Sequence, residues 1–423
     1  MQQLQRWLLL IATFASNAFA QPHTFTWQEV RDRFQTNNPT LRAAAISIDE
    51  SRSQEITAYL RPNPDLTGSV DQINPFSTQP SPNGGGNGYA PFAFAFPSAS
   101  ISYLHERQHK RELRKQSAEQ GTAIAVSQYA DQERTLLFNL RGAFVQTLQQ
   151  KAVLDLAREN LAYYNRLLTV SNDRLKAGDI AKVDYQRLEL QRVQYETDVQ
   201  TALVNLRTAK IQLLTLLNDR TPVEQFDVTG PFDFSEKISG LEELRRLAMD
   251  NRPDLKAAMQ AVEKAQTDHK LAVANGSVDP TFGADFARNP PIPVYLGLNV
   301  SIPLKIFDRN QGEKLRTQQD ITRNERLRDA ATAQVFSDVD SAYATIQSNL
   351  ALLEPYKDVY LKEAVEVRDT VSFAYTRGGA SLLDFLQAQQ DYRSTELNYL
   401  NLVGSYLTAA AQLNMAVGQE IIP

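Results

Sequence analysis

Two stretches of the sequence carry one pattern 200 residues apart. Residues 173–191 read DRLKAGDIAKVDYQRLELQ, and residues 374–392 read AYTRGGASLLDFLQAQQDY. In each stretch a glycine precedes an aspartate by six residues; the pairs are Gly178 with Asp184 and Gly378 with Asp384. A glycine between two helix-forming runs is typical of a helix that ends in the left-handed conformation. Each stretch is therefore predicted to be the turn of a helical hairpin.

Long helix-forming runs flank both turns. From about residue 106 to 175 there is no proline and there are only two glycines, and the chain returns in a similar run to about 217. The second run, from about 312 to 376, is broken once, at Pro355. Leucines interleave with alanine and small polar residues, as in helices packed in coiled-coil pairs.

The tips of the two hairpins are expected near 176–180 and 376–381. Gly178 and Gly378 would end the first helix of each hairpin, and Asp179 and Ser381 would cap the second. These turn and capping roles are structural and do not by themselves imply a function.

The same order of elements precedes each hairpin. NNPTLRAAA (37–45) is echoed by NRPDLKAAM (251–259), and NPDLTGSV (63–70) is echoed by DPTFGADF (279–286). Repeats in one order indicate a duplication. We therefore divide the chain into a first repeat (21–217), a linker (218–240) and a second repeat (241–423).

Each repeat opens with the signature of a helix start. Thr26 with Glu29, and Ser239 with Glu242, fit the capping box, in which a hydroxyl caps the helix and an acid follows three residues later. A helix of about 30 residues is expected after each box.

Each repeat then changes to period-two alternation, which predicts two strands. The four expected strands are 64–73, 92–104, 279–288 and 294–304. Strand 294–304 alternates most clearly, and its eleven residues match one tilted strand across a bilayer. The glycine-rich segment 80–88 is expected to be a flexible surface loop.

Four strands are too few to close a barrel, and an open sheet edge is not stable in lipid. If these strands cross a membrane, several chains must share one barrel. A small water-soluble sheet on a coiled-coil scaffold is the alternative that alternation leaves open.

The N-terminus and the composition bear on location. Arg6, an apolar run and a small-x-small motif ending at Ala20 predict a signal peptide over residues 1–20, cleaved near Ala20. The net charge of −5 gives no indication of nucleic-acid binding. The chain has no cysteine, so we expect neither disulfides nor a lipidated N-terminal cysteine.

Taken together, these features resemble the TolC-like outer-membrane efflux proteins over essentially the whole mature chain. The resemblance implies a mainly α fold with a membrane β-barrel, in which three protomers each give four strands to a 12-stranded barrel. Long antiparallel coiled-coil hairpins would continue that barrel as an α-barrel into the periplasm. Such a protein sits in the Gram-negative outer membrane and is a passive conduit, not an enzyme, with no cofactor.

Within that family, SIPLKIFDRNQG (301–312) is most similar to the cobalt–zinc–cadmium branch. The branch implies a homotrimer in outer-membrane lipid, a periplasmic membrane-fusion adaptor and an inner-membrane transporter of the resistance-nodulation-division (RND) type. Heavy-metal cations would be the substrate. Export of drugs or other organic compounds, and type I secretion, remain alternatives, as does a soluble periplasmic coiled-coil scaffold.

The resemblance also implies roles for the two tips, where the adaptor docks and the entrance closes. The residues that match the family's tip and gate positions are Gly178, Asp184, Tyr375, Gly378 and Asp384. Ordinary solvated carboxylates are the alternative for the two aspartates. Gln387 occupies a place where some relatives carry a second acid, which argues against a double acidic ring.

Residues 105–109 read HERQH and match the H-E-x-x-H pattern of zinc peptidases. Arg107, Lys110 and Arg111 crowd the motif, and no third ligand is evident, so a catalytic zinc is not expected. At an offset of 202 the motif aligns with FDRNQ (307–311), and the two copies share an acid, an arginine and an amide, not histidine.

We therefore interpret this segment as the junction between barrel and tunnel, where an acid in the first helical turn suits the helix dipole. The junction residues are Glu106, Arg107, Pro303, Asp308 and Arg309. His105 and His109 are retained only as a weak, adventitious metal site.

Overall fold

The structure is a computed structural model that describes residues 23–80, 87–235, 237–289 and 292–422. These residues form two compact units built from discontinuous segments. Of the described residues, unit 1 comprises those within 23–44, 129–253 and 333–422, and unit 2 comprises those within 45–128 and 254–332. Both predicted repeats contribute to both units, and the predicted signal peptide (1–20) lies outside the described residues.

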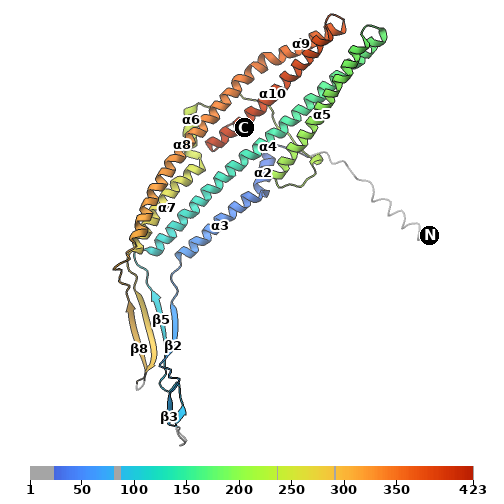
Figure 1. Cartoon of the computed structure of the whole chain (residues 1–423). Helices are drawn as coiled ribbons and strands as arrows, with labels where there is room; N and C mark the ends of the chain where they lie inside the picture. Colours follow the sequence, from blue (N-terminus) through green and yellow to red (C-terminus); the bar gives the residue numbers. More distant parts are fainter. Residues whose placement is uncertain (1–22, 81–86, 236, 290–291, 423) are drawn as a thin grey trace, which may run out of the picture. The chain divides into compact units, whose positions relative to one another are not determined.

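Unit 2 contains a four-stranded antiparallel sheet, shown in Figure 1. Its strands are β2 (Asp65–Asp71), β5 (Phe96–Leu104), β7 (Thr281–Asn289) and β8 (Ile292–Ser301). They lie in the order β2-β5-β7-β8. The two middle strands, β5 and β7, come from different halves of the chain and pair from Ser98–Ala287 to Leu104–Thr281. The four predicted strands are thus present, and they join into one sheet.

The strand predicted over 92–104 begins only at Phe96, so its first part was wrong. Residues 91–94 form a turn instead, in which the Ala95 amide donates to the Phe92 carbonyl at 3.1 Å. The Phe-Ala-Phe-Ala sequence (92–95) alternates with the period of a strand, but it does not form a strand. Close to this turn lies a short hairpin that the sequence did not predict, β3 (Thr78–Pro80) with β4 (Asn87–Tyr89). It occupies both ends of the predicted loop 80–88, whose middle (81–86) lies outside the described residues.

The strand predicted over 294–304 spans 292–301 instead. It ends at Ser301 because Pro303, two residues on, has no N–H for the ladder. At the other end Ile292 pairs with Asn289 across a bulge. The other two predicted strands differ from β2 and β7 by one or two residues at each end, which is within ordinary boundary scatter.

Unit 2 also contains most of α3 (Pro39–Tyr59), most of α7 (Pro253–Asn275), and the first parts of α4 (Lys110–Ala177) and α8 (Gln311–Pro355). Short polar contacts connect these helices. The Ser127 hydroxyl donates to Gln260 Oε1 at 2.8 Å, and His269 Nδ1 lies 2.9 Å from the Thr317 hydroxyl. These contacts join α4 to α7 and α7 to α8.

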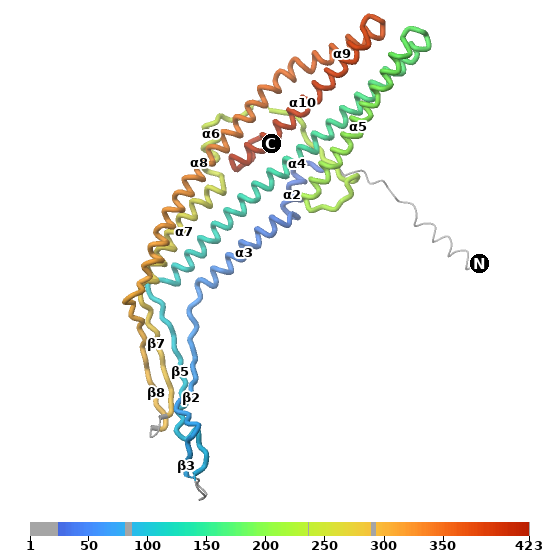
Figure 2. The backbone as a smooth tube through the Cα atoms, in the orientation of Figure 1, coloured from blue at the N-terminus to red at the C-terminus, as the bar shows by residue number. Residues whose placement is uncertain are grey.

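Unit 1 contains α2 (Trp27–Asn37), α5 (Lys182–Leu216), α6 (Leu241–Asn251), α9 (Leu361–Thr376), α10 (Leu382–Val417) and the remaining parts of α4 and α8. Figure 2 shows the turns α4–α5 and α9–α10 at the same end of this unit. Pro355, the predicted break, ends α8, and a five-residue π-helix, η2 (Tyr356–Tyr360), leads into α9.

The predicted linker 218–240 is partly ordered secondary structure. It holds a 3₁₀ turn, η1 (Val223–Gln225), and strand β6 (Phe226–Val228), which pairs in parallel with β1 (His23–Phe25). Around this ladder lies a buried core that includes Phe25, Phe34, Leu140, Phe144 and Phe226. The linker therefore contributes buried side chains to the core of unit 1.

Both predicted 30-residue helices are divided in two by a proline. Asn38 and Arg252 are extended, with ψ of 119° and 120°, because the residue before a proline avoids the helical region. The capping box at Thr26 is confirmed, with Thr26 N donating to Glu29 Oε2 at 2.8 Å. The box at Ser239 was wrong: the cap of α6 is Gly240, which has no side-chain bond.

Among the described residues, no helix combines the length and the apolar character that a membrane crossing requires.

Candidate functional site

The helical turns have the backbone that their glycines predicted. Gly178 and Gly378 have φ of +84° and +78°, a region that residues with a side chain rarely enter. The amide of Asp179 donates to the Arg174 carbonyl at 2.9 Å, and the amide of Gly379 donates to the Ala374 carbonyl at 2.8 Å. The two turns of the duplicated chain therefore close in the same way.

The helices that follow the two turns begin differently. Ser381 and Asp384 form a complete capping box at the start of α10, with hydroxyl and carboxylate 2.7 Å apart, as predicted for Ser381. The cap of α5 is Ala181, with no side-chain bond, so the predicted cap at Asp179 was wrong. Asp184 lies in the first turn of α5, 4.0 Å from Arg187 Nη1.

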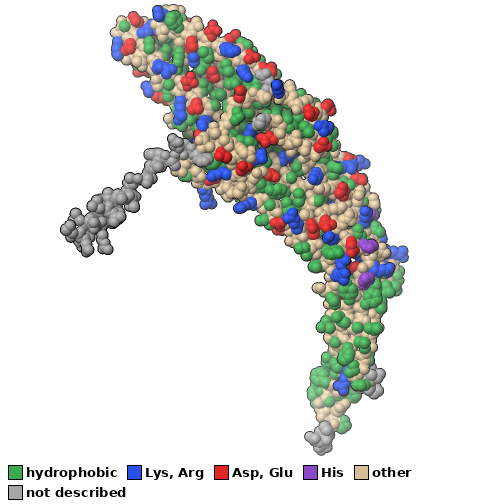
Figure 3. Space-filling view, turned by 180° about the vertical axis from the view of Figure 1, so that it is seen from behind, with side chains coloured by type: hydrophobic (Ala, Val, Ile, Leu, Met, Phe, Trp, Pro, Cys, Tyr) green, Lys and Arg blue, Asp and Glu red, His purple; other side chains and the backbone are tan. Residues whose placement is uncertain are grey.

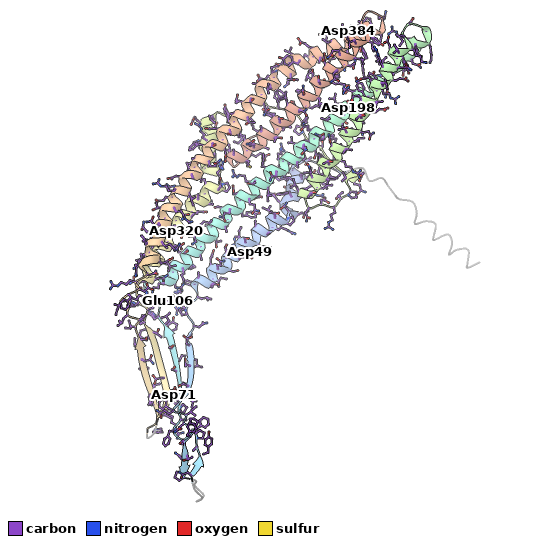
Figure 4. The ribbon with its side chains drawn as sticks, viewed as in Figure 1. Asp49, Asp71, Glu106, Asp198, Asp320 and Asp384 are labelled. Atoms are coloured by element: carbon purple, nitrogen blue, oxygen red, sulfur yellow. The ribbon has the colours of Figure 1, made fainter. Side chains whose placement is uncertain are left out.

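The setting of Asp384 affects its acidity. The hydroxyl and then the amide of Ser381 hold the pKa of the Asp384 carboxyl below its usual range. Figure 4 shows Asp384 beside the turn between α9 and α10. The two acids of the repeat are therefore not equivalent: one is committed to a helix cap and the other is not.

Below the turns of unit 1, side chains of the two hairpins interlock. Tyr375, 5% exposed, stacks on Phe385 with ring centroids 4.9 Å apart. Arg174 of the other hairpin donates through Nη1 to the Tyr375 carbonyl at 2.9 Å, and its guanidinium lies 5.5 Å from the Tyr375 ring centre. Tyr164 and Tyr195 stack 4.4 Å apart in the same apolar cluster. This buried cluster joins the tips of the two hairpins.

Sequence reasoning selected Tyr375 but missed Arg174. The partner of Tyr375 lies 201 residues away in the chain, and the position that matches Arg174 in the second repeat is Ala374. No repeat or motif therefore signals this contact.

In unit 2 the junction between strands and helices is organised by two ion pairs. Glu106 accepts two hydrogen bonds from Arg114, at 2.5 and 2.9 Å, and Arg114 Nε also donates to the Ala58 carbonyl. Lys110, 4% exposed, lies 2.5 Å from Asp279 Oδ2. Figure 4 places Glu106 where the strands meet the helices.

Asp279 receives a second donor, the amide of Arg107, at 2.9 Å. Burial by itself would raise the pKa of the Asp279 carboxyl, but Lys110 and the Arg107 amide hold it below its usual value. A carboxylate with two such partners anchors the segment that links β5 to α4.

The predicted role of the junction acids was wrong in one respect. Glu106 precedes α4, which begins at Lys110, and the acids in the first turns of α4 and α8 are Glu112 and Glu313. Glu106 pairs with Arg114 instead, and Asp308 accepts from the Asn310 amide at 2.8 Å.

The shared amide of the two junctions has a clear structural reason. Gln108 and Asn310, which match at the offset of 202, have φ of +60° and +61°. The Asn310 side chain also donates to the Ala272 carbonyl at 2.7 Å. Arg309 Nε donates to the Lys305 carbonyl at 3.3 Å. The acid–Arg–amide motif is therefore a left-handed turn that directs each strand into its helix.

The histidines do not have the geometry of a zinc helix. Residues 105–109 are not helical, and His109 has φ of +54°, so His105 and His109 do not share a helix face. His105 donates its amide to the Pro280 carbonyl and packs its ring against Phe282. No group of three or more histidine, cysteine or acidic side chains suited to a metal ion occurs in the part of the chain that the structure describes.

Comparison with known proteins gives consistent results. Residues 244–419 match the model of a family described as outer membrane efflux protein. The cobalt-zinc-cadmium resistance protein CzcC of Cupriavidus metallidurans is 24% identical over 395 residues, which cover 90% of this chain and 87% of that protein. Outer membrane protein TolC of Escherichia coli is 21% identical over 322 residues, covering 71% of this chain and 64% of TolC.

Among solved structures, CusC, whose structures concern folding and transmembrane channel formation, superimposes with a TM-score of 0.74 at 17% identity, over 96% of both chains. The likeness covers helices and strands together. The chain therefore has the fold of the outer-membrane efflux channels, as its sequence predicted.

Proposed function

Since its second half is an outer membrane efflux protein domain, we propose that this chain is the exit duct of a tripartite RND-type efflux system. Three copies would share one 12-stranded barrel in the outer membrane, and their helices would continue it as a tunnel into the periplasm. The duct is passive: it has no catalytic residue and no cofactor, and its partner transporter supplies the energy.

One observation carries this proposal. The sheet of unit 2 ends in two edge strands, β2 and β8, that have no further partner among the described residues. Exposed apolar side chains line it, including Leu66 at 81% and Leu298 at 83% exposure. A monomeric soluble protein rarely exposes such a surface, and open edges invite pairing with another chain. Pairing β2 of one copy with β8 of the next would remove the edges and turn the apolar face toward lipid.

The substrate proposed is a heavy-metal cation. Support comes from the match over most of both chains to CzcC, a cobalt-zinc-cadmium resistance protein, and from the junction sequence 301–312. Export of organic compounds or type I secretion are the alternatives for the same duct.

The partners proposed are a periplasmic membrane-fusion adaptor at the helical tips and an inner-membrane RND transporter. Gly178, Asp184, Tyr375, Gly378 and Asp384 would form the gate and the adaptor contact. The Arg174–Tyr375 contact supports this, because it would have to rearrange if the two hairpins separate. Export and signal cleavage near Ala20 are part of the proposal.

A deletion strain tests the function. Loss of the gene is expected to sensitise cells to Zn, Co, Cd or Cu, and the intact gene to restore resistance. Sensitivity to organic toxicants alone would support drug export, and loss of a secreted protein would support type I secretion. A Glu106→Gln variant is expected to leave resistance intact in a conduit, whereas a hydrolytic activity of the purified protein that this variant abolishes would favour a hydrolase.

A further inference from the structure

The register of the sheet in unit 2 separates its residues into two faces. Direct partners across the strands share a face, and neighbours along a strand alternate. One face is almost wholly apolar; it includes Leu66, Val70, Ala99, Ile101, Phe282, Ala284, Phe286, Leu296, Leu298 and Val300. The other is polar; it includes Asp65, Thr67, Ser69, Asp71, Ser98, Ser100, Ser102, Gly283, Asp285, Gly297 and Asn299.

The space-filling view agrees with this division. In Figure 3 hydrophobic side chains gather over the strand region of unit 2 on the face seen, whereas charged side chains are frequent over its helices. In a membrane barrel the apolar face meets lipid and the polar face lines the lumen. In the proposed duct the polar face is therefore the wall of the pore.

The charges on this wall are of one sign. Within the described strands, the polar face carries Asp65, Asp71 and Asp285 but no lysine or arginine. In the register of β7 and β8, Asp285 is the charged residue on the polar face, whereas Arg288 of β7 lies at the irregularity between Ala287 and Asn289.

Asp285 is held in an unusual way. A Cβ on Gly297, its direct partner on β8, would lie 2.5 Å from Asp285 Oδ2. A Cβ on Gly283 would likewise lie 2.5 Å from Asn299 Oδ1, and Asn299 Nδ2 donates to Asp285 Oδ1 at 3.4 Å. The two side chains thus lie flat over two glycines, and the carboxylate sits on the wall without projecting into the pore.

From this placement we propose that Asp285 is a specificity-determining residue of the duct, which favours cations over anions in the strand region. The inference rests on the proposed conduit. A fixed carboxylate beside a narrow ion path lowers the energy of cations and raises that of anions. Three copies would place three such carboxylates at one level of the pore.

Reversal potentials across planar bilayers under a KCl gradient test this inference. Asp285→Asn is expected to lower the cation-to-anion permeability ratio by at least about fourfold, because one unit charge roughly 8 Å from an ion in water favours a cation about twofold and disfavours an anion about twofold, and the trimer would carry three such charges. Ser100→Lys, which adds a cation at the direct partner of Asp285 on β5, should lower the ratio as well. Ser100→Asn is the matched neutral control and should leave the ratio unchanged.

The contact between Gly297 and the Asp285 carboxylate gives a second test. Gly297→Ala should push the carboxylate toward the lumen, so that single-channel conductance falls while cation preference persists. Gly68→Ala is the control, because a Cβ at Gly68 of the same sheet meets nothing within 4 Å.

Two results separate the inference from the function on which it rests. Channels that keep the wild-type permeability ratio in both Asp285→Asn and Ser100→Lys would overturn the role of Asp285 and leave the conduit intact. A wild-type protein that forms no channel would remove the conduit itself, and the inference with it.

Discussion

At the scale of single residues, the junction of unit 2 depends on Lys110, which is buried with its amine against Asp279. Neither residue was selected as a site from the sequence, because their partnership spans 169 positions and follows no periodicity. Glu106 and Arg107 were selected through the repeat, but their partners, Arg114 for Glu106 and Asp279 for the Arg107 amide, could not be read from it.

Lys110→Met should destabilise the protein by about 2 kcal/mol, because it leaves the partly buried Asp279 without its cation. The matched control is Lys115→Met, five residues along the same helix, whose ion pair with Glu119 is about half exposed and should contribute nothing measurable. Chemical unfolding in detergent, followed by circular dichroism, compares the two. Equal effects would contradict the role given to the Lys110 pair.

The same pair predicts a pH dependence. The pKa of Asp279 in the folded protein is below its usual value, so its contribution is complete above that usual value, about 3.9, and is lost as the pH falls through the lower folded pKa. The stability difference between wild type and Lys110→Met should therefore shrink below about pH 4. A difference that stays constant down to pH 2 would contradict this assignment.

At the scale of elements, the helical turns and the strands were predictable to different degrees. Glycine in a left-handed turn and a proline inside a helix act locally, so the turns at 178 and 378 and the break at Pro355 follow from the sequence. The β3–β4 hairpin and the start of β5 depend on pairing between strands, and the alternating Phe-Ala run 92–95 has the period of a strand but does not form one.

Gly178→Ala and Gly378→Ala should each cost about 1 kcal/mol, because both glycines have positive φ. Gly142→Ala, inside α4 with nothing within 4 Å of the added Cβ, should instead stabilise by roughly 0.5–1 kcal/mol. Thermal unfolding of the three variants measures the contrast. Destabilisation at all three positions would show that the penalty does not come from the turn conformation.

At the scale of the whole molecule, the duplication was visible in the sequence, and the fold followed from the resemblance that it supported. What the sequence could not give is the assembly of the compact units, since both repeats contribute to each. Because the chain has no native cysteine, introduced cysteines can test how copies meet.

A cysteine at Thr67 on β2 is expected to cross-link with one introduced at position 295, 297 or 299 on β8 of a neighbouring copy, giving covalent multimers up to a trimer. Thr67 and these β8 positions share the polar face. Cysteines at 296 or 298, on the apolar face, are the controls and should not react with it. Cross-links to the control positions alone would contradict the shared barrel.

The most direct test of the conduit is electrical recording from the purified full-length protein in planar lipid bilayers. The account predicts a detergent-stable, heat-sensitive trimer that inserts and conducts in discrete, reproducible steps. A folded protein that stays a monodisperse monomer in buffer without detergent, and produces no conductance steps, would contradict it.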